Sequence, residues 1–93
     1  MGLEFTWDPA KAAANLRKHG IAVAEAATAF GDPHSLTIAD PDHSEREERY
    51  LLIGITGTNK LVVVAHTEHG DTIRIISARR ATRRERSTYE EDT

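Results

Sequence analysis

The chain has 93 residues, of which 39% are hydrophobic and 29% charged, a balance typical of one small folded domain (residues 1–93) and not of a disordered chain. It has no cysteine, which excludes disulfides and thiolate chemistry. The net charge of −3 is uneven, because residues 74–86 hold six arginines and one glutamate. This unevenness favours a local anion site. No signal sequence or membrane-length apolar run is apparent, so we expect a cytoplasmic protein.

The first third of the chain predicts a short strand and two helices. Alternating residues at 3–7 indicate a short edge strand. An Asp-Pro pair and Gly20 are typical of a helix start and a helix end, which places a helix at 9–19. A second helix is expected at 23–30. The inner side of the first helix is predicted to carry Ala12, Ala13 and Leu16.

The rest of the chain predicts a sheet and a last helix. Short, turn-rich connections indicate that neighbouring strands are antiparallel, and the acidic stretch 40–45 is interpreted as a solvated turn. Thr82 and Glu85 form a capping-box pattern that begins a helix at 82–90. The predicted strands are 35–39, 46–56, 60–67 and 72–78. The sequence therefore predicts an α+β fold with two N-terminal helices, a four-stranded antiparallel sheet and a C-terminal helix.

Arg74 is the most informative candidate, because it interrupts an otherwise apolar strand. A guanidinium there must find a partner or line a cleft, since an unpaired buried charge is very unfavourable. One interpretation is a structural ion pair, for example with Glu48 or Glu68. The other is an anion site to which Arg79 and Arg80 contribute, because arginine binds phosphate oxygens bidentately.

Other basic residues have both a structural and a functional interpretation. Lys18 and His19 suit the end of a helix, yet histidine is also the natural proton-transfer side chain near neutral pH. Arg83 and its basic neighbours on the last helix could form a solvated face, meet an acidic partner or contact RNA.

Metal binding is not expected. His66 and His69 lie three residues apart on a strand that runs into a turn, so their side chains should diverge, and a surface histidine pair is the simpler interpretation. The carboxylates Asp40, Asp42 and Glu45 could hold a hard cation, but a solvated loop is the commoner arrangement.

Two separated motifs, in this order, resemble the BrnT toxins of bacterial type II toxin–antitoxin systems. The opening motif comprises Phe5, Trp7, Asp8, Lys11, Asn15, Lys18, His19, Gly20 and Ile21. The closing motif comprises residues 74–82 with Glu85 and Tyr89. Between them, Glu25, Asp32 and Arg49 stand where the family pattern places such residues. The resemblance covers nearly the whole chain.

The resemblance implies a RelE-like ribonuclease that cuts RNA without a metal or cofactor and inhibits growth. It also implies a cognate BrnA-like antitoxin that neutralises the toxin and brings a DNA-binding domain, so that the complex represses its own promoter. Operator DNA would be met only through that complex. The expected chemistry is attack of a ribose 2′-hydroxyl on the adjacent phosphate, which needs a base, an acid and positive charge.

On this interpretation, the candidate residues fall into a catalytic group and an RNA-binding group. Arg74 and Arg79 are predicted to stabilise the phosphate, and Lys18 and His19 to transfer protons. The catalytic candidates are Lys18, His19, Arg74, Arg79 and Tyr89, and the RNA-binding candidates are Arg49, Ser77, Arg80 and Arg83. Two alternatives remain: a non-catalytic module that docks an acidic or DNA-binding partner through its arginine-rich C-terminal segment, and a metal-dependent nuclease that uses the carboxylates.

Overall fold

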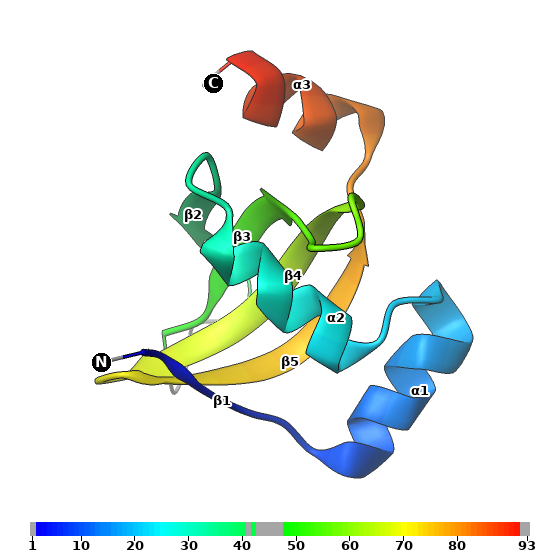
Figure 1. Ribbon diagram of the computed structural model, residues 1–93, viewed down its shortest axis with the longest axis vertical. Helices are drawn as coiled ribbons and strands as arrows, with labels where there is room; N and C mark the ends of the chain where they lie inside the picture. The colour runs from blue at the N-terminus through cyan, green and yellow to red at the C-terminus, as the bar shows by residue number, and fades with distance from the viewer. Residues whose placement is uncertain (1, 41, 43–47, 92–93) are drawn as a thin grey trace.

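The chain folds into a mixed sheet with helices on both sides. The computed structural model describes residues 2–40, 42 and 48–91. In chain order the elements are β1 (Glu4–Thr6), α1 (Pro9–His19), α2 (Val23–Ala27), the 3₁₀ turn η1 (Thr28–Gly31), β2 (Leu36–Ala39), β3 (Tyr50–Ile55), β4 (Leu61–His69), β5 (Thr72–Arg80) and α3 (Arg83–Glu91). The predicted α+β class and the order of its helices and strands are confirmed (Figure 1).

The described residues form a sheet of five strands in the order β1-β5-β4-β3-β2, one more than the four predicted. The four predicted strands pair antiparallel, as expected. The edge strand predicted at the N-terminus also forms, but it joins the sheet parallel to β5, with Thr6 opposite Arg74. The sheet is therefore mixed, whereas the prediction was a purely antiparallel sheet. Local alternation indicates that a strand forms, but the choice of a partner 68 residues away depends on tertiary packing.

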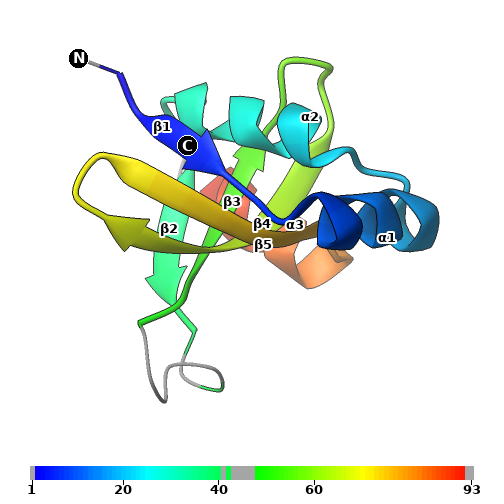
Figure 2. The same ribbon diagram turned by 90° about the horizontal axis from the view of Figure 1, so that it is seen from below.

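The helices cover the two faces of the sheet unequally. Figure 2 shows α2 on one side of the sheet, α3 on the other, and α1 at the edge beside β5. The larger core cluster joins α2 and its flanking residues to β3, β4 and β5: Ile21, Val23, Ala26, Ala29, Leu52, Val62, Val64, Ile73, Ile75 and Ala78. On the opposite face a smaller cluster packs under α3: Ile53, Leu61, Val63 and Tyr89. Among the described residues, no helix is long and apolar enough to cross a membrane.

Helix α1 has the predicted bounds, but it turns a different side inward. Asp8 accepts a hydrogen bond from the Ala10 amide (2.9 Å), and Gly20 ends the helix with a φ of 71°. Of the three residues predicted to face inward, Ala12 packs against the core, whereas Ala13 is exposed and Leu16 is 51% exposed. The inward position belongs to Asn15, which is 6% exposed. The prediction from apolar spacing failed because Asn15, a polar side chain, has hydrogen-bond partners in the protein interior.

The Asn15 amide holds α1 against the edge of β5. Its Nδ2 donates to the carbonyls of Ile21 and Ala78 (both 2.9 Å), and its Oδ1 accepts from the Ala78 amide (3.0 Å). β1 pairs with β5 only as far as Arg74, so the outward backbone groups of Ala78 have no neighbouring strand on that side. The side-chain amide takes the place of the missing strand, as buried backbone groups require.

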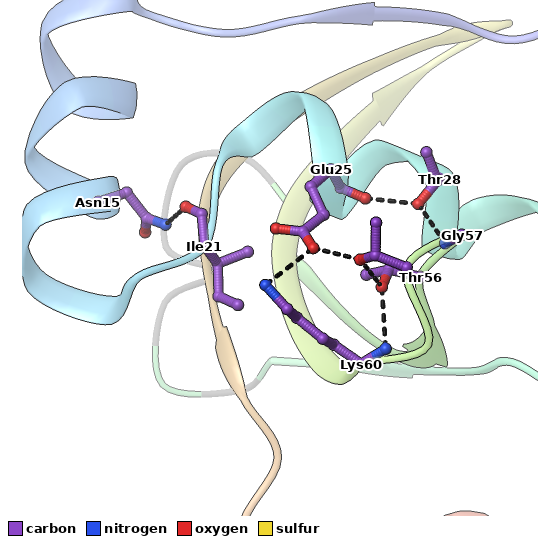
Figure 3. A network of polar contacts seen from close by, with 8 residues as sticks. Asn15, Ile21, Glu25, Thr28, Thr56, Gly57 and Lys60 are labelled. Carbon is purple, nitrogen blue, oxygen red and sulfur yellow. Dashed lines mark hydrogen bonds and ion pairs between the residues drawn. The ribbon is translucent and has the colours of Figure 1, made fainter.

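A second polar network ties α2 to the turn between β3 and β4 (Figure 3). The Glu25 carboxylate binds the Lys60 ammonium (3.0 Å) and accepts a hydrogen bond from the Thr58 hydroxyl. The Thr28 hydroxyl donates to the Glu25 carbonyl (2.6 Å) and accepts from the Gly57 amide (2.8 Å). The hydrogen bond from Thr58 and the ion pair with Lys60 lower the pKa of Glu25. The network fixes the helix over the hairpin.

The remaining differences from the predicted elements are local. The helix expected at 23–30 is an α-helix only to Ala27 and then tightens into η1, where Thr28 bonds the backbone of the preceding turn. Asp40, expected in a solvated turn, is buried, and residues 41 and 43–45 of that turn lie outside the described part of the chain. β3 begins at Tyr50; residues 46–47 of the predicted strand also lie outside the described residues.

We predict that Asn15→Ala lowers the free energy of unfolding by about 2–4 kcal/mol, because buried backbone groups lose their partners. Urea unfolding followed by circular dichroism measures the change. Leu16→Ala, one residue along the same helix, should change it by no more than about 0.5 kcal/mol, since an exposed side chain has little packing to lose. Equal losses in the two variants would contradict the assignment of Asn15 as the anchor of α1.

Candidate functional site

The predicted site residues fall into separate groups in the structure. One group lines a pocket between α1 and β5: Lys18, His19 and Ser77. A second group consists of Arg79 and Tyr89, which form hydrogen bonds with other side chains. Arg79 binds Glu85 of α3, and Tyr89 of α3 binds Asp32. Arg49 lies just before β3 and Arg74 near the start of β5, whereas the exposed Arg80 ends β5 and the exposed Arg83 begins α3. The sequence therefore identified basic residues that do not form a single cluster.

The pocket between α1 and β5 has a volume of about 220 Å³ and is rich in positive charge. Along α1, its lining residues recur at helical spacing, which turns one face of the helix to the pocket. The lining residues are Lys11, Ala14, Asn15, Lys18, His19, Ile76 and Ser77. Since no carboxylate is among them, the pocket suits an anion.

A β-bulge sets the direction of the Ser77 side chain. Ser77 lies opposite Ala65 and Ile75 lies opposite His66, so Ile76 is the extra residue without a partner on β4. Before the bulge, Ile73 and Ile75 face the α2 side, and after it Ala78 does. Arg74 and Ser77 therefore both belong to the opposite face of β5. Bulges commonly re-aim side chains beside active sites.

That opposite face carries a cross-strand row of four side chains, none of which is buried. Ile38, Leu51, Ala65 and Ser77 lie opposite one another on four successive strands, and we call them the open row. Ile38 is 53% exposed. The neighbouring row contains Ile53 and Val63, which Tyr89 of α3 covers. The open row ends at Ser77, where the pocket begins.

Arg74 is exposed, although the sequence suggested enclosure within an apolar strand. Strand alternation sends Ile73 and Ile75 into the core and Arg74 to the open face. Within the described residues, no ion pair from Arg74 to Glu48 or Glu68 is found. Its cross-strand neighbour Thr67 is 2% exposed, and its hydroxyl has no hydrogen-bond partner. The Arg74 charge is thus available to an external anion.

Arg79, in contrast, is neutralised by α3. Its Nη1 and Nη2 donate to the two carboxylate oxygens of Glu85 at 2.7 and 2.8 Å. Glu85 also accepts from the Thr82 amide (2.8 Å), and the Thr82 hydroxyl accepts from the Glu85 amide (3.2 Å), so the predicted capping box is confirmed. The bonds from Arg79, opposed by partial burial and reinforced by Thr82, lower the pKa of Glu85 to about 2.

Tyr89 also has a structural partner. Its hydroxyl donates to Asp32 (2.6 Å), and the same carboxylate accepts from the amides of Ile55 and His34 (both 2.9 Å). Burial, together with the bond to Asp32, raises the pKa of Tyr89 to about 12. These three hydrogen bonds hold the pKa of Asp32 below its usual value, although burial alone would raise it. Tyr89 therefore anchors α3 on the sheet.

The histidine pair differs from its predicted surface location. His66 is fully buried, with its ring nitrogens 3.1 Å from the Val64 carbonyl and 3.0 Å from the Glu68 carboxylate. Its ring also contacts those of Phe30 and Tyr50, because alternation along β4 turns it to the α2 side. His69 is exposed. In the described part of the chain, no three histidine or carboxylate side chains gather as a metal site would require.

Sequence reasoning assigned no role to two polar residues of the pocket. Lys11 and Asn15 stood only in the opening motif, yet both line the pocket. Their signal was the spacing of Lys11, Asn15 and Lys18, at i, i+4 and i+7, which places the three on one helix face. The search for apolar periodicity did not reveal this helix face, because its three residues are polar.

Comparison with known proteins gives one family and one fold. The family model described as "Ribonuclease toxin, BrnT, of type II toxin-antitoxin system" matches residues 7–85. Among solved structures, the crystal structure of the Brucella abortus ribonuclease toxin BrnT is similar, with a TM-score of 0.62 and 21% sequence identity over 87% of this chain and 99% of that one. No curated protein sequence matches the chain. The RelE-like relationship stays a prediction.

We predict that acid weakens the anchorage of α3 through Glu85. A carboxyl whose pKa falls from 4.5 to about 2 on folding stabilises the protein above pH 4.5, and this stabilisation is lost as pH drops through that window. Glu85→Gln should lower the free energy of unfolding by about 1–2 kcal/mol at pH 7 and flatten the profile between pH 2 and 4.5. Thermal melts at several pH values test this. Glu91→Gln, on the same helix, should leave the profile unchanged.

Tyr89→Phe tests the other contact of α3. Loss of the bond to Asp32 should reduce the free energy of unfolding by about 1–2 kcal/mol near neutral pH. A phenol whose pKa is raised from 10 to about 12 stabilises the fold fully below pH 10, and this contribution disappears towards pH 12. Absorbance titration of the wild type should show a tyrosine that ionises near pH 12, absent from the variant. An unchanged titration would contradict the contact.

Proposed function

Because the chain belongs to the BrnT family of ribonuclease toxins of type II toxin–antitoxin systems, we propose that it cleaves RNA without a metal ion, by attack of a ribose 2′-hydroxyl on the adjacent phosphate. The whole chain, residues 1–93, would act as one toxin domain. The reaction would leave a cyclic phosphate and a 5′-hydroxyl, and it needs proton transfer and stabilisation of the phosphate charge.

The position of Ser77 is the observation that supports this site best. Ser77 ends the open row on the sheet face and also lines the pocket with Lys18 and His19. Arg74 lies on the same face of β5, before the bulge, with no acidic partner in the described chain. A strand of RNA across the open row could therefore place a phosphate beside Ser77, within a positively charged surrounding.

Each residue of this site has a role that follows from its chemistry. Arg74 would bind the non-bridging oxygens and stabilise their developing charge, and the Ser77 hydroxyl would orient the phosphate. His19 would take the proton from the 2′-hydroxyl, because an imidazole exchanges protons near neutral pH. Lys18 would supply charge and a proton for the leaving oxygen.

The other candidate residues take supporting roles in this proposal. Arg79 and Tyr89, predicted as catalytic, instead fix α3 through Glu85 and Asp32, so we assign them no step of the reaction. Arg80 and Arg83 are exposed where β5 leads into α3, and they would contact RNA phosphates beyond the site, as would Arg49 at the start of β3. Such contacts position RNA without reading its sequence.

A cognate BrnA-like antitoxin is the partner that the type II family implies. We propose that it neutralises the toxin by covering the open row, and that the toxin reaches operator DNA only through this complex, which would repress its own promoter. Both events would take place in the cytoplasm. The exposed arginines of α3, Arg83 and Arg84, also suit an acidic partner, and this supports the alternative of a non-catalytic docking module.

Cleavage assays separate the two functions. We expect the purified chain to cut a short RNA in the presence of a chelator, and a single 2′-deoxy substitution at the cut to abolish cleavage. His19→Ala and Arg74→Ala should each lower the rate by about 100-fold or more. Gel analysis of labelled RNA measures the rate and mass spectrometry the cyclic phosphate.

The control is Arg17→Ala, which removes an exposed basic residue of α1 outside the pocket and should retain the wild-type rate. All variants are compared at equal folded fraction by circular dichroism. Intact RNA with a folded wild-type chain would contradict the ribonuclease proposal and favour the docking module. Loss of activity on chelation would instead favour a metal-dependent nuclease.

A further inference from the structure

The pocket beside β5 extends further than a single phosphate requires. Lys11 and Lys18 both line it, and their separation of seven positions corresponds to about two helical turns, or about 10.5 Å along the axis. Lys18 neighbours His19 and lies at the end of α1, whereas Lys11 lies in its first turn. The two lysines therefore line opposite ends of the pocket.

The course of the chain places Lys11 toward the Arg74 end of β5. β1 runs parallel to β5 and leaves it where Thr6 lies opposite Arg74, and α1 then continues along the same edge until Asn15 bonds Ala78. Lys11 falls between these two points. Arg74, Lys11 and Lys18 consequently follow the edge of β5 in this order.

The charge of this edge is not neutralised from within. Among the residues described by the structure, Lys11 and Lys18 form no ion pair, and no carboxylate lines the pocket. The frame that carries the lysines is also rigid, because the buried Asn15 amide makes three hydrogen bonds to the backbone. The pocket is thus preformed, and a bound anion would gain its interaction without reorganising α1.

We propose that Lys11 forms a separate phosphate-binding subsite, which holds the RNA phosphate adjacent to the cleaved one. This inference rests on the proposed function, since it takes the cleaved phosphate to lie at Ser77. Lys11 acts as a substrate-binding residue there and takes no part in proton transfer. A phosphodiester backbone fits the site because its charges repeat along a line, as the cations of this edge do.

The subsite has a kinetic signature. An interaction of equal strength in the ground state and the transition state changes KM and leaves kcat unaltered. Loss of one phosphate contact on a single strand also reduces the slope of log affinity against log salt by about 0.7. Lys11→Ala should therefore raise KM about 5- to 20-fold for a substrate that reaches the subsite, at unchanged kcat.

Short substrates test the proposal directly. Cleavage is measured for a dinucleotide with one phosphate and for the same dinucleotide extended by one phosphate on the 5′ or the 3′ side. One of the two extensions should raise kcat/KM for the wild type and for Arg17→Ala, the charge-matched variant on the outer side of α1. Lys11→Ala should lose this gain, and Lys11→Arg should recover most of it. Equal gains in Lys11→Ala and the wild type would overturn the proposal.

A binding measurement keeps the subsite distinct from the cleavage chemistry. The affinity of a 2′-deoxy oligonucleotide of the same sequence, which cannot be cut, is measured by fluorescence anisotropy from 50 to 300 mM salt. A reduced salt slope in Lys11→Ala alone supports phosphate binding by Lys11, even where the wild type cuts no RNA and the proposed function fails. An unchanged slope, with wild-type cleavage intact, overturns the subsite and leaves the proposed function standing.

Discussion

The bond between the Asn15 amide and the backbone of Ala78 is the interaction on which the rest of the structure depends. β1 covers only the first part of the β5 edge, and the side chain of one residue in α1 satisfies the backbone beyond it. Because the same amide also binds the Ile21 carbonyl, it fixes the helix, the following loop and the strand together. The basic face of α1 is thereby held beside β5, and the candidate site exists only in that arrangement.

The second organising feature is that the arginines near the end of the chain differ in their contacts. Arg79 is committed to Glu85 and fastens α3 to the sheet, whereas Arg74 stays exposed on the same face. One part of the basic segment thus stabilises the fold, while Arg74 forms no ion pair among the described residues. The position of α3 decides this division, because Glu85 of α3 pairs with Arg79 and Tyr89 of α3 packs with Ile53 and Val63.

Much of the fold could be predicted because its signals are local. The bounds of α1 follow from the Asp8 cap and the Gly20 turn, and the capping box of Thr82 and Glu85 follows from side-chain reach within one turn. The candidate site was less accessible. Lys18, His19 and Ser77 were identified and do come together, whereas residue spacing did not reveal the contacts of Arg79 with Glu85 and of Tyr89 with Asp32.

The sequence by itself determined the α+β class, the ends of α1, the antiparallel hairpins and, through two separated motifs, the resemblance to the BrnT family, because each of these is written in neighbouring residues or in short patterns. Only the tertiary structure decided that β1 pairs with β5, that Asn15 and not Leu16 faces inward, and that Arg79 pairs with Glu85 while Arg74 is exposed. These features depend on partners up to 68 residues apart, and the balance between burial and polar pairing settles them only once the sheet and helices are packed together.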